Sequence, residues 1–134
     1  MYWDRRTGGQ PSEMQEGHAN AGATRTGKVW MVPEGSTGGG FQTFVLVANA
    51  ESVDSRLQVT FMTEGGTART LEFNLPADSR ITINLSDWVP GFFGVATLIQ
   101  SETEVVERSM YWDMRTASSA CEAMGGHCAS GMDP

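Results

Sequence analysis

The chain has 134 residues, a net charge of −7 and 16 glycines, and 40% of its residues are hydrophobic. This length suits one domain, or one domain and a fragment of another. The acidic balance, without any basic run, argues against binding to a phosphate backbone, so we expect no nucleic-acid partner. No segment approaches the roughly 20 apolar residues that a membrane-spanning helix needs, so we expect no membrane insertion.

The central part of the chain alternates between apolar and polar residues with a period of two, which is typical of β-strands. In residues 56–62, for example, Leu57, Val59 and Phe61 share one face. Residues 41–48 alternate at first and then become fully apolar, as in a central strand of a sandwich. The predicted strands are residues 28–32, 41–48, 56–62, 68–75, 80–85, 94–100 and 103–112.

Turn residues separate these strands. Glu64, Gly65, Gly66 and Thr67 predict a tight hairpin, because glycine accepts the positive φ that such turns require. The 3.6-residue periodicity of an amphipathic helix is missing from the sequence. About seven short strands therefore predict an all-β fold, an immunoglobulin-like antiparallel β-sandwich with long glycine-rich terminal segments.

The two ends of the chain repeat each other. Met-Tyr-Trp-Asp at residues 1–4 recurs at residues 110–113, and the alignment continues without a gap at an offset of 109. Ten of the 22 aligned positions are identical, among them His18 and His127. We interpret the chain as one full repeat followed by the opening of the next.

The repeat divides the chain into three parts. Residues 1–26 are an N-terminal arm that copies the repeat junction, residues 27–113 are the β-sandwich module, and residues 114–134 are a C-terminal junction loop with two cysteines. Met1 aligns with the internal Met110, and the residues after it lack the apolar segment of a signal peptide. We favour a segment of a longer tandem-repeat chain, and a native start methionine on a cytosolic protein is the alternative.

Several short runs stand out together. They are WMVPEGSTGGGF at residues 30–41, VAN at 47–49, VVERSMYW at 105–112 and the Gly-His pair at 126–127. As a set they resemble a tandem β-sandwich repeat domain of unknown function from bacterial secreted and cell-surface proteins. The resemblance extends from residue 28 to residue 127 and implies an extracellular module without a catalytic role. The two cysteines depart from that pattern.

Cys121 and Cys128 are both absent from the N-terminal copy, where Ser12 and Ala19 stand. Their joint presence predicts a disulfide, and closing so short a loop stabilises a fold by roughly 2.5 kcal/mol. A disulfide implies an oxidising compartment, so we expect a secreted, extracellular or cell-surface protein. Two unpaired thiols in a reducing cytosol are the alternative, and the spacing does not fit a zinc site.

The residues that the repeat places at the junctions are candidate contacts between modules or subunits. They are Met1, Tyr2, Trp3, Tyr111, Trp112, His18 and His127. Alternation along a strand sends Tyr and Trp to opposite faces, so we expect one ring inside the module and the other over the following segment. Each histidine is a metal ligand, a pH-sensitive contact or, as we favour, a residue that fixes its loop. A contact with Glu13 or Glu122 within the same copy would serve that purpose.

Motifs for catalysis are lacking: the sequence contains no nucleophile elbow, phosphate-binding loop, HExxH or CxxC. Glu102, Glu104 and Glu107 cluster on one strand, and we interpret them as a solvated acidic surface rather than as a catalytic pair. We predict that the chain is not an enzyme and uses no cofactor or metal.

Two non-catalytic functions remain. The favoured one is a structural subunit or repeat module of an extracellular filament or cell-surface layer, which joins copies of itself head to tail through its terminal segments. The alternative is a carbohydrate-binding or adhesive module for surface glycans. In that case Trp30, Trp88 and Trp112 would supply an exposed aromatic platform, although packing within the module is the simpler expectation.

Overall fold

The computed structural model of the chain describes residues 2–3, 16–17, 21, 23–66, 68–113 and 124–132. Its strands are β1 (Tyr2–Trp3), β2 (Glu16–Gly17), β3 (Gly27–Val32), β4 (Phe41–Asn49), β5 (Ser55–Thr63), β6 (Ala68–Leu75), β7 (Ser79–Asn84), β8 (Val95–Asp113) and β9 (Met124–Ser130). In this part of the chain the helical structure is one short 3₁₀ turn, η1 (Leu85–Asp87). The all-β class predicted from the sequence is confirmed.

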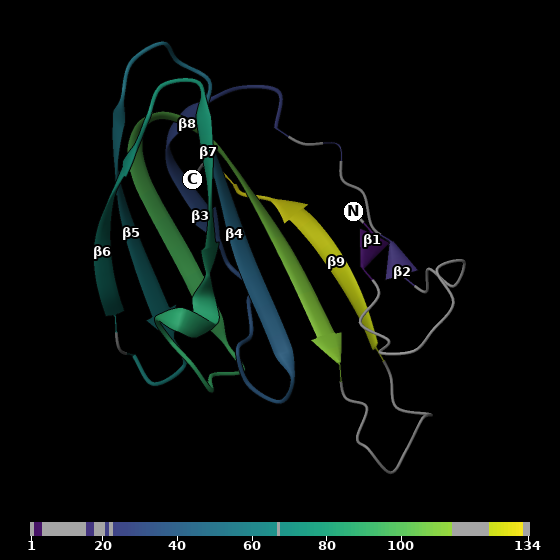
Figure 1. The fold of residues 1–134 in the computed structure, drawn as a ribbon. Helices are drawn as coiled ribbons and strands as arrows, with labels where there is room; N and C mark the ends of the chain where they lie inside the picture. The colour runs from purple at the N-terminus through teal and green to yellow at the C-terminus, as the bar shows by residue number, and fades with distance from the viewer. Residues whose placement is uncertain are drawn as a thin grey trace.

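Strands β3 to β9 form one continuous seven-stranded antiparallel sheet that folds over along the long strand β8, so that its two halves lie face to face as the two sheets of a sandwich (Figure 1). The first half of β8 pairs with β5 and β3, and β5 pairs in turn with β6. The second half of β8 pairs with β4 and β9, and β4 pairs in turn with β7. The predicted sandwich architecture is therefore confirmed, with one strand belonging to both sheets.

The core lies between the sheets and takes one face of each strand. β5 contributes Leu57, Val59 and Phe61, each at most 1% exposed, as their period-two alternation predicts. From the facing sheet, Val45 and Val47 of β4 are fully buried. Burial of an apolar side chain of this size stabilises a fold by about 1.5–3 kcal/mol, so these facing residues hold the two sheets together.

β4 is apolar on both of its faces, which explains its uninterrupted apolar run. Val45 and Val47 face the core, whereas Leu46 lies on the opposite face and is still only 9% exposed. A strand that is covered on both faces has a continuous apolar sequence. The outer face of this sheet is therefore not an ordinary solvent-exposed face.

Where the sequence predicts two strands, residues 94–100 and 103–112, the structure has the single strand β8. In Figure 1 this strand runs up one sheet, bends, and runs down the other. The core-facing positions change from odd-numbered residues such as Ile99 to even-numbered residues such as Val106, and the register with β3 shifts in the same region. From the Val29–Gln100 pair to the Gly27–Glu104 pair, β8 advances by four residues and β3 by two. An irregularity of this kind bends a strand. The polar residues between positions 100 and 103, where the sequence predicts a break between two strands, form a bend within one strand.

The hairpin predicted between residues 64 and 67 joins β5 to β6. The two strands pair antiparallel, with Met62 opposite Ala68, and Gly66 has a φ of 74°. Glycine adopts this conformation without the steric cost that a side chain would add. The prediction of a tight hairpin here is confirmed.

The segment predicted as a C-terminal junction loop, residues 114–134, contains the strand β9, so that part of the prediction is wrong. Its sequence is rich in glycine and has no apolar alternation, so the strand forms through backbone pairing with β8 rather than through an apolar pattern. Beyond β9 the chain reaches β3 of the other sheet. There Met31 and Met132 exchange two backbone hydrogen bonds of 2.7 and 2.8 Å.

Candidate functional site

The repeat detected in the sequence is also a repeat of structure. β1 and β2 form an arm hairpin near the N-terminus, and the end of β8 forms a terminal hairpin with β9. The opposed residues are Tyr2 with Gly17 and Trp3 with Glu16 in the arm hairpin, and Tyr111 with Gly126 and Trp112 with Gly125 in the terminal hairpin. Adding the repeat offset of 109 to both residue numbers of an arm-hairpin pair gives the corresponding pair of the terminal hairpin.

Both hairpins have the same connection length. Twelve residues lie between Trp3 and Glu16, and twelve lie between Trp112 and Gly125. The two hairpins have different neighbours, since the terminal hairpin continues into the sandwich and the arm hairpin forms a separate two-stranded sheet. The two hairpins pair in the same register although their neighbouring strands differ, which indicates that the junction sequence itself encodes the hairpin.

The arm hairpin lies next to the terminal hairpin. β2 runs close to β9 in space, as Figure 1 shows. Among the described strands, however, β1 and β2 pair only with each other. The two hairpins are therefore neighbours that do not share a ladder of backbone hydrogen bonds.

Several residues on the outer face of the sheet that contains the terminal hairpin are buried. Arg108 lies opposite the core-facing Val45 and therefore faces the core itself. Ser109 and Tyr111 are at odd-numbered positions of the same strand, so they point away from the core. Each of the two is nevertheless only 6% exposed. Phe44 packs edge-on against Tyr111, with the ring centroids 6.0 Å apart. The outer face of this sheet therefore combines Phe44, Leu46, Tyr111 and Cys128 with the polar residues Gln42, Glu107 and Ser109.

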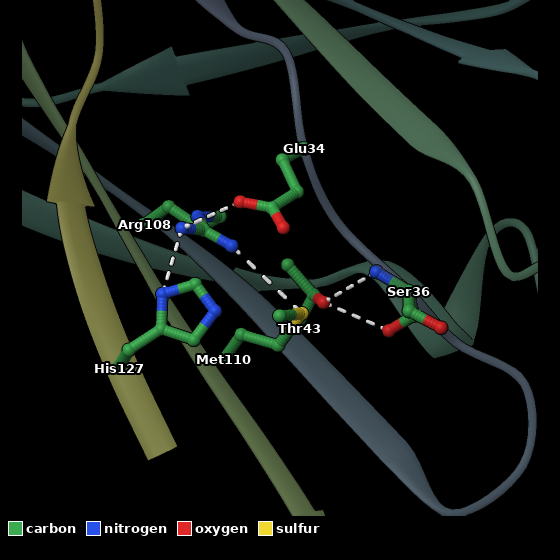
Figure 2. Close-up of polar contacts among 6 residues, drawn as sticks. All are labelled: Glu34, Ser36, Thr43, Arg108, Met110 and His127. Carbon is green, nitrogen blue, oxygen red and sulfur yellow. Dashed lines mark hydrogen bonds and ion pairs between the residues drawn. The ribbon is translucent and has the colours of Figure 1, made fainter.

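On the core side of the same sheet, a buried arginine connects β8, β9 and the loop before β4 (Figure 2). Arg108 is 3% exposed, and its Nη2 donates to Nδ1 of His127 at 3.0 Å. The same nitrogen lies 3.3 Å from Oε2 of Glu34. Arginine only donates hydrogen bonds, so Nδ1 of His127 accepts one and the imidazole is neutral, with its proton on Nε2.

Burial is the main influence on the charges of this cluster. It lowers the pKa of Arg108, and the nearby Glu34 and Cys128 oppose that effect. Burial also lowers the pKa of His127, the positive charge of Arg108 lowers it further, and Glu34 opposes both. His127 is thus held in the neutral form that accepts the hydrogen bond from Arg108.

The loop that carries Glu34, residues 33–40, is fastened to the sandwich by Thr43. The hydroxyl of Thr43, which is fully buried, accepts from the backbone N–H of Ser36 at 2.9 Å and donates to the carbonyl of the same residue at 2.8 Å. Gly35 lies so close to the sandwich that a Cβ would be 3.1 Å from Cγ2 of Thr43 and from the carbonyl oxygen of Val95. These contacts place Glu34 over Arg108 (Figure 2).

Five of the seven predicted junction residues lie among the described residues, in two hairpins. Tyr2 and Trp3 lie in the arm hairpin, and Tyr111 and Trp112 lie in the terminal hairpin. The Tyr111 ring packs against Phe44 on the outer face of the sheet. Met1 and His18 lie outside the described residues, as do Glu13 and Glu122 with their predicted histidine contacts.

The predicted disulfide involves one described cysteine. Cys128 lies half-buried in β9, on the outer face, and is a thiol in this structure. Cys121 lies outside the described residues. The Cys121–Cys128 disulfide therefore stays a prediction.

Trp30 is packed within the module, as the simpler expectation had it: it is 3% exposed, and its indole N–H donates to the carbonyl of Gly27 at 3.2 Å. One interpretation of exposure is wrong. Glu104, expected on a solvated acidic surface, is fully buried. The cause for Glu104 is the bend in β8, which turns even-numbered residues toward the core after the strand has begun with odd-numbered ones.

The sequence analysis missed Arg108 and Glu34. A usable signal existed, because Arg108 alternates with the apolar residues Val106 and Met110 on one face of a strand. A charge at an otherwise apolar position indicates burial with a partner, since an isolated buried charge is very costly. The partner comes from a loop 74 residues earlier in the chain, which no local pattern could identify.

The two carboxylates that line one groove of the described surface already have partners. A groove of about 360 Å³ is lined by Glu34, Glu64 and Phe93, among others. Glu34 is paired with Arg108, and the carboxylate of Glu64 accepts the backbone N–H groups of Phe93 and Gly94. Within the described ranges, no group of three or more His, Cys, Asp and Glu could hold a metal ion. No helix in those ranges is long and apolar enough to cross a membrane.

No protein-family model and no curated protein matches this chain. Solved structures do match it. The crystal structure of Thermotoga maritima 1070 is similar with a TM-score of 0.67 and 13% identity, over 78% of this chain and 92% of that one. The Anabaena sensory rhodopsin transducer is similar with a TM-score of 0.54 and 20% identity, over 66% of this chain and 99% of that one. At these identities the similarity shows a shared fold.

Proposed function

We propose that this chain is a structural module of an extracellular filament or cell-surface layer, which joins copies of itself head to tail through its terminal segments. The observation that carries the proposal is the duplicated hairpin. A module that contains one hairpin near its start and a copy of it near its end has matching parts for a contact between successive copies.

Such a contact uses two different surfaces, one from each partner. A contact of this kind builds an open filament unless its rotation closes a ring. The acidic chain has 16 Asp and Glu against 9 Lys and Arg, and a net charge of this kind favours solubility of the surface outside such a contact.

Two further observations support an extracellular location. The cysteine pair is present in one copy of the repeat and absent from the other, as expected for a disulfide gained as a unit. The runs that resemble bacterial surface repeats form β3, the loop after it, β4 and β8, so they belong to one folded module.

A carbohydrate-binding module is the less favoured function. Trp30 is buried, and the ring of Trp88 is half-buried with the guanidinium of Arg69 5.1 Å from its centroid. Phe73 packs against Trp88 as well, with the ring centroids 6.2 Å apart. A sugar would have to displace the arginine before it could stack on this ring.

The proposal is tested by the mass of the purified chain across a wide range of concentrations, measured by multi-angle light scattering, together with electron microscopy of the concentrated sample. We expect a mass that grows with concentration and linear particles with a regular axial repeat. A monomeric mass at every concentration would contradict self-association. Non-reducing peptide mass spectrometry of exported protein checks the location, because two free thiols would contradict an oxidised pair.

A further inference from the structure

We infer that Asn84 is a site of N-linked glycosylation, and that the first sugar of the glycan packs against the ring of Phe44. The inference rests on the extracellular location in the proposed function, because the transferases that use lipid-linked sugar donors act on exported chains. It goes beyond that function by naming a modified residue and the chemical class of its reaction partner.

The chain contains one acceptor sequence for N-linked glycans. Asn84, Leu85 and Ser86 form Asn-x-Ser, in which the middle residue is not proline. The other asparagines are not followed by Ser or Thr at the second position; they are Asn20, Asn49 and Asn74. A motif this short arises often by chance, so the inference depends on where the structure places it.

The structure places the motif in a surface turn, where β7 ends and η1 begins. Leu85 anchors this turn in the core and is 1% exposed, whereas Asn84 and Ser86 are only half-buried. Among the described strands β7 pairs with β4 alone, so it lies at the edge of its sheet. A glycan on Asn84 therefore extends from an edge of the sandwich rather than from the middle of a sheet.

The side-chain amide of Asn84 can carry a sugar without losing a hydrogen bond. Its Oδ1 accepts the backbone N–H of Ser86 at 3.1 Å, and its Nδ2 donates to Oδ1 of Asp87 at 3.3 Å. Nδ2 has two hydrogens, of which N-linked glycosylation replaces one. One N–H remains for Asp87, so the modification is compatible with the folded turn.

The transfer reaction requires a sugar donor with a phosphate leaving group. Nδ2 of Asn84 gives up one proton to a base of the transferase and forms a bond to C1 of the sugar. The bond between C1 and a phosphate oxygen of the lipid-linked donor breaks, and the lipid phosphate leaves with that electron pair. Asn84 keeps its carbonyl oxygen, which still accepts the N–H of Ser86.

Phe44 provides a surface for the first sugar. It lies directly opposite Asn84 on β4, so the two side chains are on the same outer face, with Cβ atoms about 5 Å apart. Phe44 is half-buried, and Tyr111 packs edge-on against it with the ring centroids 6.0 Å apart, which holds the ring in place. The open part of the ring is an apolar surface within reach of a sugar on Nδ2.

Peptide mass spectrometry of the full chain, exported by the organism that makes it, tests the modification. We expect a glycan on Asn84 in the unaltered chain and in Ser86→Thr, and its complete loss in Ser86→Ala. Ser86→Ala leaves the turn intact, because Ser86 contacts Asn84 through its backbone N–H. Pro76→Ser is the matched control, since it creates a second acceptor at Asn74, which is exposed on the outer face of the other sheet, opposite Arg56.

Thermal unfolding tests the contact with Phe44. The glycosylated unaltered chain should melt at a higher temperature than Ser86→Ala, and in a Phe44→Leu background most of that difference should disappear. A glycan on Asn74 should give no such increase when Pro76→Ser is compared with Pro76→Ala, because the residue opposite Asn74 is not aromatic.

The possible failures are distinguishable. An exported chain with an unmodified Asn84 overturns the inference and leaves the proposed function standing. A chain that cell fractionation finds in the cytosol overturns both, because the proposed location is then wrong. If the Phe44→Leu background keeps the full difference in melting temperature, the packing of the first sugar on Phe44 is wrong.

Discussion

Nη2 of Arg108 donates to Nδ1 of His127 across 3.0 Å, so a charged side chain of β8 fixes the tautomer of a side chain of β9. The two strands are also joined by their backbone ladder. Because β9 is poor in apolar residues, this side-chain contact is a principal link between the terminal hairpin and the interior of the sandwich. The contact requires that His127 be neutral.

The stability of the fold should fall as the pH is lowered through the titration of His127. The pKa of His127 is lowered in the folded protein, so below the ordinary histidine pKa of about 6.5 the unfolded chain binds more protons than the folded one. The contribution of neutral His127 is present above that pH and is lost as the pH falls through the lowered value. His127→Asn keeps an acceptor near the Nδ1 position and does not titrate. Thermal unfolding between about pH 7.5 and pH 5 should show a smaller loss for His127→Asn than for the unaltered chain; equal losses would contradict this.

Glu34→Gln should destabilise the fold by about 1 kcal/mol, because it removes the counter-charge of the buried Arg108. The cost is less than for a fully buried pair, since the Glu34 side chain is 67% exposed. In an Arg108→Met background the same Glu34→Gln change should have no effect, because no charge remains to be paired. Urea unfolding of the four proteins measures the coupling, and costs that simply add would show that the two residues act independently.

Thr43→Val should destabilise the fold by about 1–3 kcal/mol, because the backbone N–H and carbonyl of Ser36 lose their buried partner. Valine has the shape of threonine, so packing changes little. Thr82→Val is the control: Thr82 is exposed on β7, opposite Leu46, and we expect an effect within about 0.5 kcal/mol. Hydrogen exchange should in addition show faster exchange of the Ser36 amide in Thr43→Val alone.

Gly131→Ala should loosen the end of the terminal hairpin. A Cβ at this position would lie 3.0 Å from Cε3 of Trp30 and 3.3 Å from Cβ of Val106, both in the core. We expect a loss of about 1–3 kcal/mol from overpacking. At Gly65 a Cβ would meet nothing nearer than 3.8 Å, so Gly65→Ala serves as the control. Equal unfolding midpoints of the two variants would show that residue 131 has room to adjust.

The central strands were predictable because each buries one face, and burial imposes a period of two. β5 and β6 match their predicted bounds to within one residue at each end. The duplicated junction was also visible, and its strand pairing follows the repeat. In both cases the information lies in residues close to one another in the chain.

The remaining features depend on distant partners. β9 forms because the backbone of β8 is available beside it, and no apolar pattern records that fact. The bend in β8 changes which residues face the core, and it thereby buries Glu104 against expectation. Arg108 lies in a predicted strand, but its partner Glu34 comes from a loop whose position is set by Thr43. Sequence periodicity reports burial along one strand, whereas these contacts depend on how strands and loops are arranged.

The strand β8 has a further consequence for how the module unfolds. Its 19 residues pair with β3, β5, β4 and β9. Both sheets depend on β8, so unfolding of one sheet removes a strand from the other. The sandwich should therefore behave as one cooperative unit, in which amides of both sheets become open to hydrogen exchange at the same free energy. In a row of such modules, a pull along the chain would be resisted by each module as a whole rather than by its weaker sheet.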